Sequence, residues 1–114
     1  MHVPDLQALN RYVNTHYRVT QHALAWADEG QPAYDCKGLA ALKIDALERA
    51  GVSPSDLTVL LVNDGRHVVL RVGADCVLDE NPDGACERST DYTIWGELPA
   101  YIWSGFIPQA RGAR

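Results

Sequence analysis

Three side chains in this 114-residue sequence have the chemical types of a thiol-based catalytic triad: Cys36, His67 and Asp79. In such a triad a thiolate attacks a carbonyl carbon, an imidazole transfers the proton, and a carboxylate holds the imidazole in the required tautomer. The reaction would be acyl transfer through a thioester. Each residue also has a structural interpretation, because lone cysteines mostly fill cores and aspartates mostly form turns. The elements that carry the three residues therefore decide between the two interpretations.

Cys36 is expected at the first turn of a helix. Apolar residues follow it at the intervals of three and four that are typical of one helix face: Leu39, Leu42, Ala46, Leu47 and Ala50. Gly51 is placed to end this helix. Free backbone N–H groups and the helix dipole at such an N-terminus favour a thiolate, and the N–H of Cys36 itself is a candidate donor to an oxyanion.

His67 and Asp79 are expected on neighbouring strands. The runs "LTVLLV" (57–62), "HVVLRV" (67–72) and "CVLD" (76–79) have the composition of strands, and the turn signals "NDG" and "GAD" separate them. His67 would then begin the second strand, and Asp79 would end the third.

The contact between these two residues depends on the strand register. With a three-residue "GAD" loop, Val72 pairs with Cys76 and Val69 lies opposite Asp79, so that His67 is one diagonal step away on the same face. A two-residue loop would instead put the two side chains on opposite faces. The predicted contact is therefore conditional on the longer loop.

Two further regions complete the expected fold. Apolar residues at helical spacing predict an amphipathic N-terminal helix: Val3, Leu6, Leu9, Val13 and Tyr17. A shorter helix is expected after Thr20, through "HALAWA". The tail from Tyr92 is expected to be irregular and packed over the sheet, because its aromatic residues stand among Gly and Pro: Trp95, Tyr101, Trp103 and Phe106. Helices followed by an antiparallel meander predict an α+β fold, in a single domain spanning residues 1–114.

Charge and hydropathy argue against several classes of function. The formal net charge of −5 is spread without long runs and would repel phosphate backbones, so no nucleic-acid partner is expected. The apolar runs are too short to cross a bilayer, so no membrane partner is expected either. The N-terminal segment "MHVPDLQALNRYVN" lacks the basic start and apolar core of a secretory signal, which predicts a cytoplasmic protein as synthesised.

The state of Cys76 and Cys86 is left open by the sequence. Three cysteines at this density do not make a disulfide scaffold, although these two could pair across the loop between them. Together with Cys36 and His67 they have the donor types of a zinc site, but close CxxC spacing is absent. We therefore expect no metal and no cofactor.

Three segments resemble bacterial transglutaminase-like cysteine peptidases, a group that includes periplasmic peptidases that clip large surface adhesins: "YDCKGLAALKIDAL", "LTVLLVNDGRHVVLRV" and "VLDENPDG". In that family a cysteine opens a helix, a histidine begins a strand as His-Xaa-Val-Leu, and an aspartate closes the next strand. The resemblance implies a papain-like (transglutaminase-like) fold, with the nucleophile helix packed on an antiparallel sheet. It also implies that Cys36 is the nucleophile, His67 the base and Asp79 the orienting acid.

The chain departs from this family pattern around the cysteine. Tyr34 replaces a glycine, and Lys37 and Gly38 replace an acidic pair. The calcium site that some relatives carry beside that pair is therefore not expected, because calcium prefers clustered oxygen ligands. Gln31, at a distance reminiscent of papain-like enzymes, and the indole N–H of Trp26 are candidate oxyanion donors, although a turn explains Gln31 better and a core position explains Trp26 better, so the N–H of Cys36 is preferred.

The leading hypothesis is a cysteine peptidase or amidase that hydrolyses a peptide or isopeptide bond through a thioester. Its substrate would be a protein or a peptidoglycan peptide. Two alternatives stay open on the same fold: a transamidating acyltransferase, and a catalytically silent binding or virion-associated module. The short chain also suggests a phage protein. No pattern in the sequence indicates the natural substrate or the oligomeric state.

Overall fold

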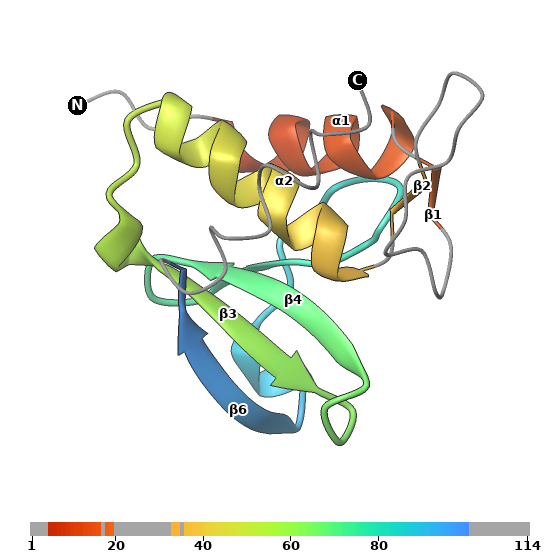
Figure 1. The fold of residues 1–114 in the computed structure, drawn as a ribbon, viewed down its shortest axis with the longest axis vertical. Coiled ribbons are helices and arrows are strands. Elements are labelled where there is room, and N and C mark those ends of the chain that lie inside the picture. The colour runs from red at the N-terminus through yellow and green to blue at the C-terminus, as the bar shows by residue number, and fades with distance from the viewer. Residues whose placement is uncertain (1–4, 17, 20–32, 35, 101–114) are drawn as a thin grey trace.

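Two helices and a four-stranded antiparallel sheet form most of the described structure (Figure 1). The computed structural model describes residues 5–16, 18–19, 33–34 and 36–100. The elements in chain order are α1 (Leu6–His16), β1 (Arg18–Val19), β2 (Ala33–Tyr34), α2 (Cys36–Arg49), the 3-10 helix η1 (Pro54–Asp56), β3 (Leu57–Val62), β4 (His67–Val72), β5 (Cys76–Leu78), the 3-10 helix η2 (Ser89–Asp91) and β6 (Ile94–Pro99). The predicted α+β class is confirmed. The short parallel pair of β1 and β2 was not predicted.

The first helix, α1, begins after Asp5. The carboxylate of Asp5 accepts a hydrogen bond from the N–H of Ala8 at 3.1 Å, which satisfies a donor that the first turn of a helix leaves free. Val13 on the predicted apolar face is buried, and so is the polar Asn10. The two ends of that predicted face and the short helix predicted at "HALAWA" lie outside the described residues.

The second helix, α2, begins at Cys36 and ends at Arg49, as predicted. Gly51 then takes a φ of 99°, a left-handed conformation that glycine adopts without steric cost. The N–H of Gly51 donates to the carbonyl of Glu48 at 3.0 Å. Glycine therefore ends the helix by accepting a backbone conformation that other residues resist.

The sheet has the strand order β5-β4-β3-β6 with antiparallel neighbours. The turn between β3 and β4 contains three residues with positive φ: Asn63 at 54°, Asp64 at 57° and Gly65 at 81°. Asparagine, aspartate and glycine are the residues that enter this region most readily. Val62 pairs with His67 across the turn, so His67 is the first residue of β4.

The register of β4 and β5 is the one predicted from a three-residue loop. Val72 lies opposite Cys76, and Leu70 lies opposite Leu78. If this register is continued by one residue, Asp79 lies just past the end of β5. Its side chain is then on the same side of the sheet as the side chain of His67. The condition for the predicted contact between these two residues is therefore met.

The prediction of an irregular tail is wrong for residues 94–99, which form the regular strand β6. β6 pairs with β3 on the side away from β4, with a register shift between Leu61 and Val62. Gly96 and Pro99 concealed this strand in the sequence, because both are poor strand formers that edge positions tolerate. Trp95 on this strand is 65% exposed and does not pack over the sheet. The rest of the predicted tail, beyond Ala100, lies outside the described residues.

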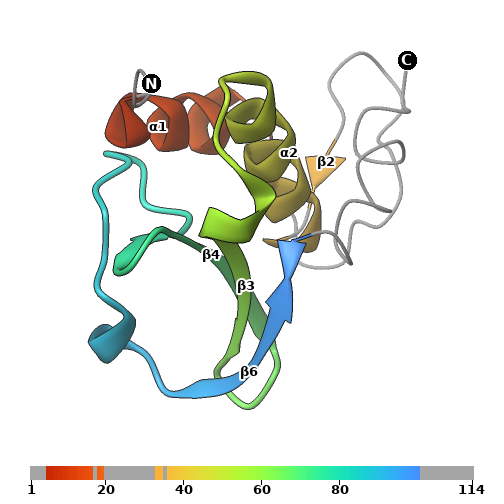
Figure 2. The same cartoon turned by 90° about the vertical axis from the view of Figure 1, so that its left-hand side faces the viewer.

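Apolar side chains pack on both faces of the sheet. The face toward the helices joins α1, α2 and the strands in one cluster of buried residues: Val13, Leu39, Ala40, Ala41, Leu42, Ile44, Leu47, Leu57, Val59, Val68, Leu70, Leu78 and Ala100. The other face carries a smaller cluster: Leu60, Val62, Val69 and Val77, with Tyr92 and Ile94 packed against it. Figure 2 shows the two helices side by side, and the chain from β5 to β6 arching away from the sheet before β6 returns beside β3.

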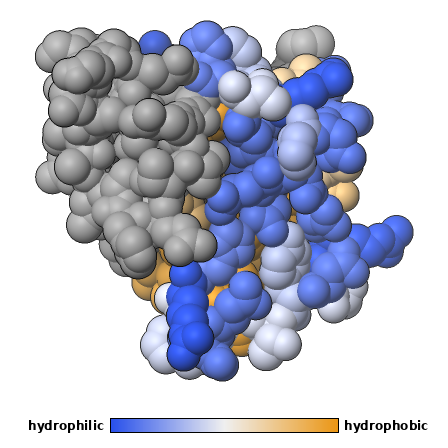
Figure 3. Space-filling model, turned by 90° about the vertical axis from the view of Figure 1, so that its right-hand side faces the viewer, coloured by the Kyte–Doolittle hydropathy of each residue, from blue (hydrophilic) through white to orange (hydrophobic). Residues whose placement is uncertain are grey.

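The described surface is largely polar where Figure 3 shows it. Hydrophilic side chains cover most of the described part of that face, and apolar side chains are visible only in small areas between them. Among the helices in the described part of the chain, none is long and apolar enough to cross a membrane.

Candidate active site

The three residues of the predicted triad meet at one point of the fold. Cys36 is the first residue of α2, His67 is the first residue of β4, and Asp79 directly follows β5. The Nε2 atom of His67 lies 2.7 Å from Oδ1 of Asp79, a hydrogen bond. The same imidazole also interacts with the side chain of Cys36. The structure therefore brings together all three side chains that the sequence predicted.

The contact with Asp79 determines which ring nitrogen remains for the thiol. A carboxylate accepts a hydrogen bond, so Nε2 of His67 carries a proton and donates it to Asp79. The other nitrogen, Nδ1, is not used by Asp79 and is the one that could exchange a proton with a thiol. Oε2 of Glu80 lies 3.6 Å from Nδ1. At this distance the two groups form an ion pair when the imidazole is protonated. Glu80 is a charged neighbour of the site that sequence reasoning missed.

The surroundings of His67 stabilise its protonated form. The pKa of His67 is raised from 6.5 to about 10, chiefly by the hydrogen bond to Asp79 and next by the interaction with Cys36, while partial burial opposes the rise. A carboxylate beside an imidazole has this effect because it attracts the imidazolium and leaves the neutral ring unaffected. His67 is therefore a positively charged neighbour for the Cys36 thiol at neutral pH.

The carboxylate of Asp79 is fully engaged. Oδ1 accepts hydrogen bonds from His67 Nε2 and from the N–H of Glu80, both at 2.7 Å, and Oδ2 accepts one from the hydroxyl of Tyr92 at 2.5 Å. Partial burial disfavours the charge of Asp79, but these hydrogen bonds outweigh it and lower its pKa to about 2. Asp79 is thus an ionised acceptor over the whole neutral and mildly acidic range.

The backbone of Asp79 is held by side chains from both helices. Nδ2 of Asn14 in α1 donates to the carbonyl oxygen of Asp79 at 2.7 Å, and Nζ of Lys43 in α2 donates to the same oxygen at 3.1 Å. Asn14 also donates to the carbonyl of Asn81 at 2.9 Å. These contacts fix the backbone of Asp79 relative to α2, the helix that begins with Cys36.

Lys43 is an unusual member of this group because it is almost completely buried. Its side chain is 2% exposed, and burial lowers its pKa from 10.5 to about 8, although the negative charges of Asp79 and Glu80 act in the opposite direction. Buried lysines are rare unless they are paired. Lys43 follows Cys36 by seven residues, a spacing that places both on the same face of α2 and that indicates in the sequence that Lys43 lies near the site.

The segment after Asp79 is also fastened to α1. Nδ2 of the buried Asn10 donates to the carbonyl of Gly84 at 3.2 Å. Gly84 has a φ of 76°, and a Cβ at this position would lie 2.4 Å from the backbone oxygen of Gln7. Only glycine permits so close an approach of this segment to the helix.

A disulfide between Cys76 and Cys86 closes the same segment. The sequence left the state of these two cysteines open, and the structure shows them bonded to each other. Two of the four possible zinc donors are therefore engaged in the disulfide. The Val77 and Glu87 backbones also form an antiparallel bridge beside the disulfide. Cys36 is a free thiol.

Three side chains, two of them from the triad, have ligand atoms close enough together to bind a metal ion. Atoms of His67, Asp79 and Glu80 all lie within 4.8 Å of one another. However, both oxygens of Asp79 already accept hydrogen bonds, one of them from His67. We therefore assign the contact between His67 and Asp79 to the triad and propose no metal at this group.

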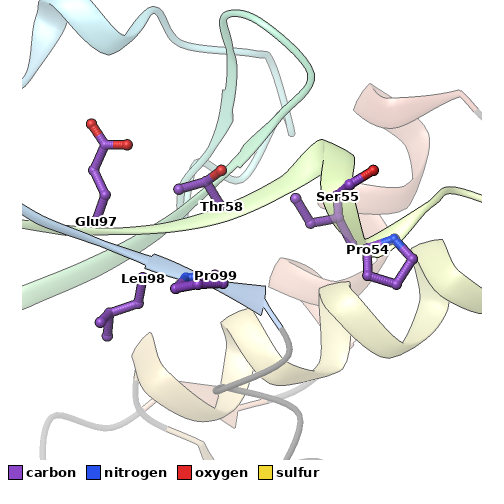
Figure 4. A pocket seen from close by; sticks show the side chains of 7 residues that line it. Pro54, Ser55, Thr58, Glu97, Leu98 and Pro99 are labelled. Atoms are coloured by element: carbon purple, nitrogen blue, oxygen red, sulfur yellow. The ribbon is translucent and has the colours of Figure 1, made fainter.

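The remaining predicted site residues, Gln31 and Trp26, lie outside the described residues. The structure also contains a pocket of about 560 Å³ that is separate from the triad (Figure 4). It lies between η1, β3 and β6, and its lining consists of Pro54, Ser55, Leu57, Thr58, Glu97, Leu98 and Pro99. None of the triad residues lines this pocket.

No protein-family model matches the chain, and it has no match among curated proteins or solved structures.

Proposed function

We propose that this protein is a thiol-dependent hydrolase that cleaves a peptide or isopeptide bond through a thioester on Cys36. The observation that carries the proposal is the imidazole of His67, which contacts the carboxylate of Asp79 through Nε2 and also interacts with Cys36 at the N-terminus of α2. These are the nucleophile, the proton carrier and the orienting acid of a cysteine hydrolase.

The electrostatics favour a preformed ion pair. An ordinary cysteine thiol titrates near pKa ~8.5, whereas His67 holds its proton up to a pKa of about 10. The imidazolium of His67 is therefore a positive charge that would stabilise a thiolate at Cys36, and we propose that the two form an ion pair before substrate binds. The N-terminus of α2 adds to this effect, because its free N–H groups and the helix dipole stabilise an anion.

The proposed reaction proceeds in two half-reactions. The thiolate of Cys36 attacks the carbonyl carbon of the amide, and backbone N–H groups at the start of α2 bind the resulting oxyanion. The C–N bond then breaks, and the proton on His67 passes to the departing amine, which leaves a thioester. Water next gives a proton to His67 and attacks the thioester carbon. The C–S bond breaks, the carboxylic acid leaves, and the thiolate–imidazolium pair is restored.

The arrangement supports the papain-like (transglutaminase-like) fold and the peptidase family that the sequence resembles. A helix that begins with the nucleophile packs against an antiparallel sheet that carries the base and the acid. The substrate would be an amide in a protein or in a peptidoglycan peptide. Glu80, beside Nδ1 of His67, places negative charge where the amine departs, and this favours a leaving group that becomes an ammonium ion.

The test is the pH dependence of the alkylation of Cys36 by iodoacetamide. The disulfide protects Cys76 and Cys86, so the oxidised protein has one reactive thiol. We expect labelling at pH 6 to be at least about tenfold faster in the wild type than in His67→Ala. His16→Ala, which removes an imidazole from the end of α1, serves as the control and should label like the wild type.

The opposite outcome is equally clear. If labelling rises only near pH ~8.5, at the same rate in all three proteins, Cys36 is an ordinary thiol and the proposed hydrolase is wrong. The catalytically silent binding module would then be the better interpretation of this fold.

A further inference from the structure

We propose that Tyr92 is a positioning residue of this site: its hydroxyl holds the Asp79 carboxylate in the orientation that presents Oδ1 to His67. The inference rests on the proposed function, because it assigns a fourth side chain to the same reaction. Tyr92 touches neither Cys36 nor His67 in the contacts described above, and it acts through Asp79.

The hydrogen bonds of Asp79 divide between its two oxygens in a way that gives Tyr92 this role. Oδ1 receives His67 Nε2 and the N–H of Glu80, whereas Oδ2 receives the Tyr92 hydroxyl at 2.5 Å. A carboxylate with a free second oxygen can rotate about its Cβ–Cγ bond and offer either oxygen to the imidazole. A donor on Oδ2 that comes from a different element removes this freedom.

Tyr92 can serve as a fixed donor because its own position is determined by packing. Its ring packs against the cluster on the face of the sheet opposite the helices, and its backbone N–H donates to the carbonyl of Ser89 at 3.2 Å, which ends η2. Burial first, and the hydrogen bond to Asp79 next, raise the pKa of Tyr92 above its ordinary value. The hydroxyl therefore keeps its proton and remains a donor throughout the pH range in which a thiolate–imidazolium pair would work.

The contact also joins the end of β5 to the segment that leads into β6. Asp79 follows β5 and is held from the helix side by Asn14 and Lys43, whereas Tyr92 belongs to the segment that leads into β6. The backbone carbonyl of Asp79 is thus held from the helix side, and its carboxylate is held by Tyr92 from the other side of the sheet. Its orientation depends on the second apolar cluster as well as on the helices.

The experiment is a double-mutant cycle with Tyr92→Phe and Asp79→Asn, read by the rate of Cys36 alkylation at pH 6. Tyr92→Phe keeps the packed ring and removes only the hydroxyl. Because the hydroxyl would act on the rate only through the orientation of Asp79, we expect a rate loss of about threefold to tenfold in the protein that retains Asp79. In the Asp79→Asn protein the same change should alter the rate by less than about 1.5-fold. Tyr12→Phe, at an exposed tyrosine on α1, is the matched control and should have no effect.

A spectroscopic readout keeps the inference separate from the proposed function. The Nε2 proton of His67, hydrogen-bonded to Asp79, should give a slowly exchanging downfield NMR signal that weakens or disappears in Tyr92→Phe but persists in Tyr12→Phe. If Cys36 proves to be an ordinary thiol, this signal still tests the role of Tyr92. An unchanged signal in Tyr92→Phe, or an equal rate loss in both members of the cycle, would overturn the inference. Thermal unfolding of each variant identifies any loss that is due to instability alone.

Discussion

Replacing Lys43 with methionine should stabilise this protein at neutral pH, although it removes a contact to the candidate site. Lys43 is 2% exposed and donates one hydrogen bond, from Nζ to the carbonyl of Asp79. Methionine has a similar length and fills buried space without a charge. The variant therefore separates the cost of a buried ammonium ion from the benefit of its single hydrogen bond.

The magnitude follows from the pKa of Lys43. A fall from 10.5 to about 8 means that burial of the charge, less the attraction of Asp79 and Glu80, costs about 3 kcal/mol at pH 7. Loss of the hydrogen bond costs the variant about 1 kcal/mol. The net expectation is a gain of about 2 kcal/mol in the free energy of unfolding, in line with the behaviour of other buried charges replaced by apolar side chains.

The gain should depend on pH in a defined direction. Below pH 8 the amine is protonated in both the folded and the unfolded wild type, so the cost of the buried charge is fully present. Between pH 8 and 10.5 the unfolded chain binds more protons than the folded protein, and the wild type becomes more stable as pH rises. The advantage of the variant is therefore largest below pH 8 and disappears toward pH 10.5.

Urea unfolding of the disulfide-intact proteins at pH 7 and at pH 10 measures both effects. Arg49→Met removes a positive charge from the same helix at a position that is 66% exposed, and it should change stability by less than about 0.5 kcal/mol at either pH. A Lys43→Met protein that is less stable than wild type by about 1 kcal/mol or more at pH 7 would refute the reasoning. The hydrogen bond and the nearby carboxylates would then outweigh desolvation.

Two further predictions concern the segment that carries Asp79. Asn14→Leu removes the donors to the carbonyls of Asp79 and Asn81, so it should lower the free energy of unfolding by about 2 kcal/mol, measured by urea unfolding; a loss below about 0.5 kcal/mol would contradict the assigned contacts. Replacing Cys76 and Cys86 together by Ser opens a loop with a sequence separation of 10, and the chain-entropy model gives a loss of about 3 kcal/mol. Calorimetry in the absence of reductant tests this, and an unchanged Tm would show that the segment is held without the bond.

The parts of the fold that the sequence predicts are those set by local chemistry. Gly51 marked the end of α2 because a left-handed backbone conformation there favours glycine. The three residues of the "GAD" loop determined the register of β4 and β5, and that register led to the predicted contact between His67 and Asp79. In each case a few neighbouring residues are sufficient to determine the local structure.

The contacts that the sequence does not predict are those between distant segments. Asn14 and Asp79 are separated by 65 positions, and Lys43 and Asp79 by 36. The residues around a polar side chain in an amphipathic helix do not predict which acceptor on another element it will contact. Tyr92 appeared only as the start of an aromatic tail, since its partner is defined by how the chain arches between β5 and β6. The strand β6 was missed for a related reason, because its pairing with β3 outweighs the poor strand propensity of Gly96 and Pro99.

The buried polar residues of the core contact the same segment, the one that carries Asp79, and so link the fold to the site. Among the residues that the structure describes, Asn10 and Lys43 are the buried polar or charged ones, and both donate to carbonyls in the segment that follows β5. Apolar packing alone would place this segment only approximately, because hydrophobic contacts have no direction. A hydrogen bond to a particular carbonyl specifies both distance and angle. The helices therefore position the segment that begins with Asp79 by polar contacts, one of which, from the buried Lys43, we expect to lower stability.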